Sequence, residues 1–129
     1  MIRLLIVEDR PEIRRGLRMR LSAELDIAVI GEAASAELLV EQVQVLRPQV
    51  VLMDIEFPPG SDGIAAAVEL GRRVPEVAVV LLTIHDDAAC RARAKRAGAK
   101  AFVPKSAPIE CLLDAIRGTS CLSPGAPVA

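Results

Sequence analysis

VVLMD, residues 50–54, is the stretch of sequence that decides the fold. Four apolar residues run into an aspartate, and the chain then breaks into the turn-forming sequence PPGSDG at 58–63. A short apolar run with such a boundary is typical of a parallel strand that is buried on both faces. Asp54 is therefore expected at the carboxyl edge of a sheet, where open α/β sheets bind their ligands.

Strand-like and helix-like segments alternate five times along the chain. Apolar runs predict strands over 3–7, 27–33, 50–53, 77–82 and 100–103. Helical spacing of apolar residues predicts five helices. They begin near residues 11, 35, 64, 86 and 108, and the last two end near 97 and 117.

Punctuating residues set the expected limits of these helices. Pro11 suits the first turn of the first helix. Ser35 is expected to cap the second helix, which buries Leu39, Val43 and Leu46 and stops at Pro48. The third helix is expected to end at Pro75. Asp86 or Asp87 is expected to cap the fourth, and Gly98 to end it.

This alternation predicts an α/β fold: a flavodoxin-like (CheY-like), doubly wound sandwich. Its five parallel strands are expected in the order 2-1-3-4-5, with five helices on the two faces. Residues 1–118 make one domain in this interpretation. Residues 119–129 have no periodicity and are expected to be a linker stub or a disordered tail.

Composition excludes several classes of protein. The net charge is −1 and aromatic residues are 2% of the 129, which argues against direct nucleic acid binding. No apolar stretch approaches 18 residues, and the amino terminus enters a strand directly, so no membrane span or signal peptide is expected. Cys90, Cys111 and Cys121 are odd in number and fit reduced thiols. These features predict a soluble cytoplasmic domain.

Acidic residues end two of the predicted strands. Glu8 and Asp9 follow the first strand, and Asp54 closes the third. Strands one and three are neighbours in the expected order, so the three carboxylates meet and repel one another. Mg²⁺ resolves such a conflict, because it binds one or two carboxylates, waters and a phosphate.

Two further strand ends supply groups suited to a phosphoryl group. Thr83 ends the fourth strand with a hydroxyl, and Lys105 follows the fifth with a positive charge. Asp54 is then a candidate nucleophile, since carboxylates form aspartyl phosphates. Taken singly, each residue also fits a capping, turn or loop role.

In these residues the chain resembles the receiver domain of a bacterial two-component response regulator, over residues 1 to about 118. The resemblance implies that Asp54 accepts a phosphoryl group from a sensor histidine kinase or phosphotransfer protein. It implies Mg²⁺ on Asp9, Asp54 and the backbone carbonyl of Glu56, with Glu8 binding through water. Thr83 and Lys105 would contact the phosphoryl oxygens. Such a protein is a phosphoacceptor rather than an enzyme.

The resemblance also implies roles around this centre. Thr83 and Phe102 match the residues that switch conformation on activation in this family. Glu56 and His85, two residues beyond Asp54 and Thr83, match positions that tune the lifetime of the phosphoryl group.

The sequence departs from the family pattern in two places. Pro58 stands at the usual position after Asp54, but Gly63 is one residue later than usual, so the loop is expected to be one residue longer. Pro104 directly precedes Lys105, and its fixed φ angle is expected to affect how Lys105 reaches the site.

The output is open at this point. Residues 116–124 resemble the junction that precedes a helix-turn-helix domain in LuxR/NarL-type regulators, which predicts control of transcription. A stand-alone receiver and a phosphorylation-independent interaction module are alternatives, as is a small phosphohydrolase using Asp54 and Glu56. A homodimer through surface helices is a further expectation. Arginines 14, 15, 18 and 20 are interpreted first as a solvated helix face.

Overall fold

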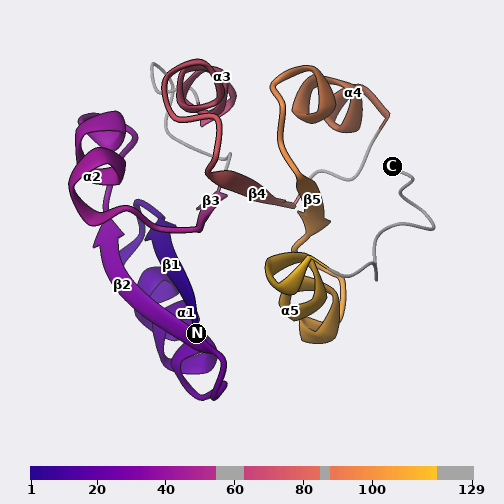
Figure 1. The fold of residues 1–129 in the computed structure, drawn as a ribbon. Coiled ribbons are helices and arrows are strands. Elements are labelled where there is room, and N and C mark those ends of the chain that lie inside the picture. The colour runs from indigo at the N-terminus through magenta and orange to yellow at the C-terminus, as the bar shows by residue number, and fades with distance from the viewer. Residues whose placement is uncertain (55–62, 85–87, 119–129) are drawn as a thin grey trace.

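Five parallel strands form the central sheet of the computed structural model, which describes residues 1–54, 63–84 and 88–118 (Figure 1). The strand order is β2-β1-β3-β4-β5, as the sequence predicted. The strands are β1 (Ile2–Val7), β2 (Ile27–Ala33), β3 (Val50–Asp54), β4 (Ala78–Thr83) and β5 (Ala101–Pro104). The helices are α1 (Pro11–Ser22), α2 (Leu39–Leu46), α3 (Gly63–Arg73), α4 (Ala88–Arg96) and α5 (Ile109–Arg117).

Alternate residues of the strands feed two separate cores, because successive side chains of a strand point to opposite faces. On one face Val51 and Met53 pack with residues of α2, α3 and α4. On the other face Val50 and Leu52 pack with residues of α1 and α5. Figure 1 shows α3 and α4 on one side of the sheet and α5 on the other. Burial on both faces explains why these strands have almost no polar residues.

Helix limits agree with the punctuation of the sequence at most of the described ends. Pro11 is the first residue of α1, as expected. Gly98 and Gly118 follow α4 and α5 with φ angles of 85° and 83°, a conformation that costs glycine little. The expected caps Asp86 and Asp87 lie outside the described residues.

The start of α2 differs from the expectation. Ser35 does not cap this helix; its Oγ accepts a hydrogen bond from the backbone N–H of Glu37 at 3.3 Å, within a turn. The helix begins at Leu39 instead, after Leu38 adopts a left-handed φ of 60°. Leu46, expected in the core, is 37% exposed. Its Cδ1 lies over Gly31, where an added Cβ would come within 2.8 Å of it.

The end of α5 is tied to the turn that precedes β2. Arg117 donates from Nε to Asp26 Oδ2 at 2.7 Å and from Nη2 to Asp26 Oδ1 at 2.8 Å. Its Nη2 also donates to Glu24 Oε1 at 2.8 Å. These bonds join residues more than ninety positions apart in the sequence. The last described helix is thereby fixed at the amino edge of the sheet.

The cysteines correct one expectation. Cys90 is a half-buried thiol outside any disulfide. Cys111, however, is disulfide-bonded. The expectation of three reduced thiols rested on their odd number and on the compartment, and neither excludes one pair. In the part of the chain that the structure describes, no helix has the length and apolar character needed to cross a membrane.

Candidate functional site

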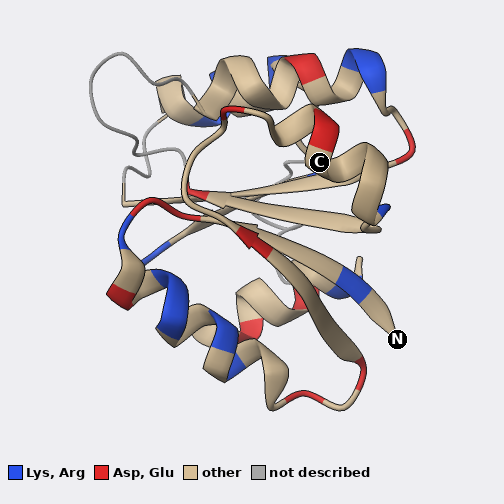
Figure 2. Ribbon diagram, turned by 90° about the vertical axis from the view of Figure 1, so that its left-hand side faces the viewer, with Lys and Arg blue, Asp and Glu red and all other residues tan. Residues whose placement is uncertain are grey.

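The polar residues singled out in the sequence converge at the carboxyl edge of the sheet. Val7 pairs with Met53 in the register of β1 and β3, so Glu8 and Asp54 follow at the same level. Asp54 pairs with Leu82, which places Thr83 one residue further along the neighbouring strand. Figure 2 shows the acidic stretch after β1 next to the acidic end of β3. The parallel register is what brings these residues together.

Asp54 is buried and bound to a lysine. Its side chain is 1% exposed, and Lys105 Nζ donates to its Oδ2 at 2.6 Å. The Lys105 side chain is itself only 18% exposed. A charge-assisted bond of this length compensates a carboxylate that has been withdrawn from water. Pro104 therefore does not keep Lys105 from reaching Asp54.

Glu8 is the second buried acid of the site. Burial and, to a smaller extent, the nearby carboxyl group of Asp54 together raise its pKa from 4.5 to about 7, against a backbone N–H of Arg10 that lowers it. Oε1 of Glu8 and Oδ1 of Asp9 are buried without any hydrogen-bond partner. Buried polar atoms are rarely left unsatisfied, so these two oxygens are suited to a ligand.

A divalent cation fits this donor set. The orphaned oxygens belong to carboxylates, which are the ligands that hard cations prefer. Among the described residues, no three acidic, histidine or cysteine side chains are arranged to hold a metal by themselves. Mg²⁺ does not need three, because it retains several waters and binds one or two carboxylates. The expected backbone ligand at Glu56 lies outside the described residues.

Thr83 and Phe102 lie on the two strands next to Asp54. Thr83 is fully buried at the end of β4, and its carbonyl accepts the backbone N–H of Lys105 at 2.6 Å. Phe102 is half-buried on β5, where it pairs with Leu81 and packs against the core beneath α3 and α4. The Arg91 guanidinium of α4 lies over its ring, 6.0 Å from the centroid. His85, like Glu56, lies outside the described residues.

Two arginines of the site were not singled out from the sequence. Arg10 lies against both Glu8 and Asp54, with ion-pair distances of 3.7 Å to each. Arg14, interpreted as part of a solvated face, donates to the carbonyl of Glu8 at 2.8 Å and to Glu32 Oε1 at 3.2 Å. A cation directly after the acidic pair Glu8 and Asp9 is the sequence signal that would have found Arg10.

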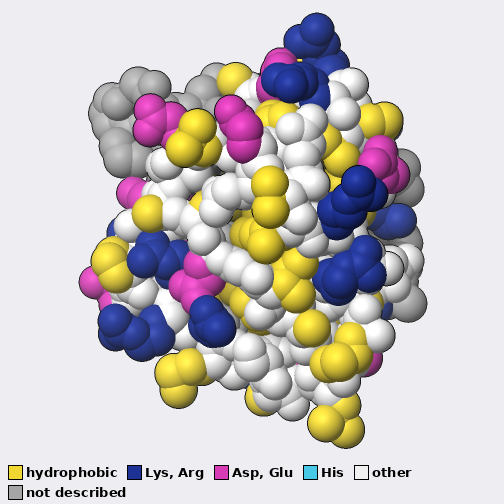
Figure 3. Space-filling view, turned by 60° about the vertical axis from the view of Figure 1, so that its left-hand side comes forward, with side chains coloured by type: hydrophobic (Ala, Val, Ile, Leu, Met, Phe, Trp, Pro, Cys, Tyr) yellow, Lys and Arg dark blue, Asp and Glu magenta, His cyan; other side chains and the backbone are white. Residues whose placement is uncertain are grey.

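The ion pairs of Glu32 extend across a mixed surface. Arg18 donates to Glu32 Oε2, while Arg14 occupies the other oxygen of the same carboxylate. Figure 3 shows basic and acidic side chains lying next to one another on the face that carries α1 and β2. Arg14 and Arg18 therefore link α1 to β2, which corrects the interpretation of these two as merely solvated.

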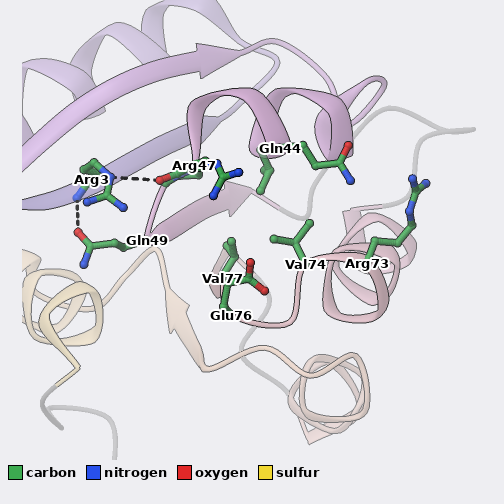
Figure 4. Close-up of a pocket in the computed structure, with 10 residues that line it drawn as sticks. Arg3, Gln44, Arg47, Gln49, Arg73, Val74, Glu76 and Val77 are labelled. Carbon is green, nitrogen blue, oxygen red and sulfur yellow. Dashed lines mark hydrogen bonds between the residues drawn. The ribbon is translucent and has the colours of Figure 1, made fainter.

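A hollow of about 500 Å³ lies at the opposite, amino edge of the sheet (Figure 4). Its polar lining includes Arg3, Arg47, Arg73 and Glu76, with Val74 and Val77 between them. Arg3 Nε donates to the carbonyl of Arg47 at 3.1 Å. Arginines near helix C-terminal ends have a local role, because they complement the negative end of the helix dipole.

Comparison with known proteins agrees with the geometry. Residues 4–117 match the family described as response regulator receiver domain. The oxygen regulatory protein NreC of Staphylococcus aureus strain JH9 is 34% identical over 116 residues, which are 90% of this chain and 54% of that protein. NreC of Staphylococcus haemolyticus is 33% identical over the same share of each chain. The chain thus spans about half the length of these curated relatives.

Solved structures give the same match. The signal receiver domain of NarL from Mycobacterium tuberculosis has a TM-score of 0.79 at 28% identity, covering 91% of this chain and 97% of that one. A two-component response regulator of the LuxR family from Aurantimonas sp. SI85-9A1 has a TM-score of 0.84 at 27% identity, covering 97% and 91%.

Proposed function

The chain belongs to the family of response regulator receiver domains, and we propose that Asp54 is its phosphoacceptor. The observation that carries the proposal is the contact between Lys105 Nζ and the buried Asp54 carboxylate, 2.6 Å long, beside two unsatisfied acidic oxygens. The phosphoryl donor is a histidine kinase or a phosphotransfer protein. The predicted cytoplasmic location stays a prediction.

The reaction is a displacement at phosphorus. An oxygen of Asp54 forms the new O–P bond while the N–P bond of the donor phosphohistidine breaks, and the imidazole leaves with the electron pair and takes up a proton. Lys105 holds the carboxylate of Asp54 in place before the reaction, and afterwards contacts a phosphoryl oxygen. Asp9, Asp54 and the backbone carbonyl of Glu56 would hold Mg²⁺, with Glu8 contacting it through a water. The ion would neutralise part of the charge on the transferring group.

The conformational response passes through β4 and β5. The Thr83 hydroxyl turns to donate to the new phosphoryl group, and the space it leaves lets Phe102 move further inward. Glu56 and His85 tune how long the phosphoryl group survives. In this proposal the output is control of transcription, supported by the similarity to the oxygen regulatory protein NreC and to the LuxR-family response regulator from Aurantimonas. Homodimer formation after phosphorylation belongs to the same proposal.

Intact mass measurement after incubation with acetyl phosphate and Mg²⁺ tests this proposal. The wild-type protein is expected to gain the mass of one phosphoryl group in an adduct labile to hydroxylamine. Asp54→Asn is expected to gain none, because an amide is not a nucleophile for this reaction. Asp26→Asn is the matched control, since Asp26 lies outside the site and is bound by Arg117. An adduct that persists in Asp54→Asn, or none in the wild type, contradicts the proposal and favours a phosphorylation-independent module.

A further inference from the structure

Arg10 occupies a position that helix formation does not explain. It is the N-cap residue of α1, with φ and ψ of −88° and 118°, and its side chain makes no capping hydrogen bond. Ser, Thr, Asp and Asn are the residues that cap this position well. A positive charge is also unfavourable at the positive end of a helix dipole. Another interaction must favour Arg10 at this position, and its contacts show that the acids of the site provide it.

The guanidinium of Arg10 bridges the two buried acids. Nε lies 3.7 Å from Glu8 Oε2, and Nη2 lies 3.7 Å from Asp54 Oδ2. The backbone N–H of the same residue donates to Glu8 Oε2 at 3.1 Å. Both side-chain distances exceed those of a hydrogen bond, so neither carboxylate holds the guanidinium tightly.

Two cations thus lie close to the same oxygen of Asp54. Lys105 contacts Oδ2 at 2.6 Å from within, with 18% of its side chain exposed. Arg10 approaches the same atom at 3.7 Å with 49% of its side chain exposed, so it lies at the mouth of the site. A half-exposed pair at this distance is weak and readily exchanged for a better anion.

We infer that Arg10 is a second phosphoryl-binding cation of this site, which takes up the dianionic phosphoryl group at the mouth and holds it beside Lys105. The planar fork of N–H groups matches two phosphoryl oxygens at once, which a lysine cannot do. Without a phosphoryl group, the same fork partly neutralises Glu8 and Asp54. The inference rests on the proposed function and adds a second cation that contacts the phosphoryl group.

Binding of beryllofluoride, a phosphoryl mimic, measures this role without any turnover. Calorimetric titration at saturating Mg²⁺ compares the wild type with Arg10→Gln, which removes the charge, and Arg10→Lys, which keeps the charge without the fork. Affinity is expected to fall about ten-fold in Arg10→Gln and about three-fold in Arg10→Lys, because hydrogen bonds to charged groups are worth about this much at a half-exposed position. Arg15→Gln, an exposed arginine on the same helix, is expected to match the wild type.

A check of folding and the acetyl phosphate test separate the possible outcomes. Circular dichroism checks that each variant is folded; if Arg10→Gln is not, the comparison of Arg10→Lys with the wild type decides. Unchanged or tighter beryllofluoride binding in the folded variants overturns the inference and leaves Arg10 as a counterion of the acids only. If the wild type itself binds no beryllofluoride and takes no phosphoryl group from acetyl phosphate, the proposed function fails, and the inference with it.

Discussion

At the carboxyl edge of the sheet, Glu8, Asp54 and Lys105 are largely withdrawn from water. At the amino edge, Arg3, Arg47 and Arg73 surround a hollow but are exposed. The guanidinium groups of the amino edge remain hydrated or bind nearby backbone and side-chain oxygens. The carboxyl edge instead leaves two acidic oxygens buried and unsatisfied.

This difference shows that burial of the charged groups, rather than their presence alone, makes an ionic cluster a site. A solvated arginine gains little from a new partner, because water already serves it. A buried carboxylate depends on whichever cation reaches it, so loss or arrival of that cation changes the free energy strongly. Substitutions at the two edges are therefore expected to differ in size, and the following predictions are ordered by that size.

Lys105→Met is expected to have the largest effect on stability. It leaves Asp54 buried without its hydrogen-bonded cation and should lower the free energy of unfolding by about 3 kcal/mol at pH 8 without Mg²⁺. Urea denaturation measures the change. Asp54→Asn in the same background should recover most of it, because the uncompensated charge is then gone. A single variant as stable as the wild type would mean that the buried pair contributes nothing.

The pH dependence of stability comes next. Glu8 has its pKa raised from 4.5 to about 7, so its protonated form is favoured by folding. The stabilisation that protonated Glu8 gives to the folded state is fully present below pH 4.5 and is lost as the pH rises through about 7. Without Mg²⁺, the free energy of unfolding is expected to fall by about 2 kcal/mol between pH 5 and pH 8. Glu8→Gln should remove most of this fall, as urea titrations at several pH values would reveal.

The affinity for Mg²⁺ should depend on whether Glu8 is protonated. Because the metal favours the ionised acids, its apparent affinity is expected to weaken as the pH falls below 7. Glu24 and Asp26 do not interfere in this range, since Arg20 lowers the pKa of Glu24 and Arg117 that of Asp26. Calorimetric Mg²⁺ titrations at pH 6 and pH 8 measure the effect. Equal affinities at both values would count against Glu8 as part of the metal site.

Arg47→Gly, at the amino edge, is expected to raise stability slightly. Arg47 has a left-handed φ of 54° at the end of α2, which glycine adopts without strain. The gain should be about 0.5–1 kcal/mol in thermal or urea denaturation, despite the loss of a positive charge. A clear loss of stability would show that the Arg47 side chain does more than the structure indicates.

Arg73→Gln should have the smallest effect. Its guanidinium is half exposed and lies 3.6 Å from Glu69 Oε2, at the limit of an ion pair. The free energy of unfolding is expected to change by less than about 0.5 kcal/mol, since exposed pairs contribute little. A change as large as that of Lys105→Met would remove the distinction between the two edges.

The sheet and the acidic half of the site were predictable from sequence because each depends on a local pattern. An apolar run such as VVLMD has one stable place, between two helical layers, and parallel register then aligns the residues that follow each strand. That is why Glu8, Asp54, Thr83 and Lys105 were found as a group. Their roles in phosphoryl transfer stay predictions until the proposed measurements are made.

Two of the features that sequence reasoning missed, the contacts of Arg14 and Arg10, depend on partners distant in the chain, whereas Ser35 bonds locally to Glu37. Ser35 has the right side chain for a cap, but the chain turns within its next residues and the helix starts later. Arg14 has the pattern of a solvated arginine until Glu32 of β2 is placed beside it. The contact of Arg10 with Asp54 arises from register between strands. None of these pairings leaves a periodic signal.

The hydrogen bonds between Arg117 and Asp26 restrict how α5 can move. Two parallel bonds to one carboxylate oppose rotation of the C-terminal end of α5 about its own axis. Glu24 adds a third point of attachment. Nine helical residues make α5 a rod roughly 13 Å long, pinned at the end farther from Asp54. A displacement near Lys105 is therefore expected to tilt α5 about its C-terminal end, where Arg117 is bound, rather than to slide the helix.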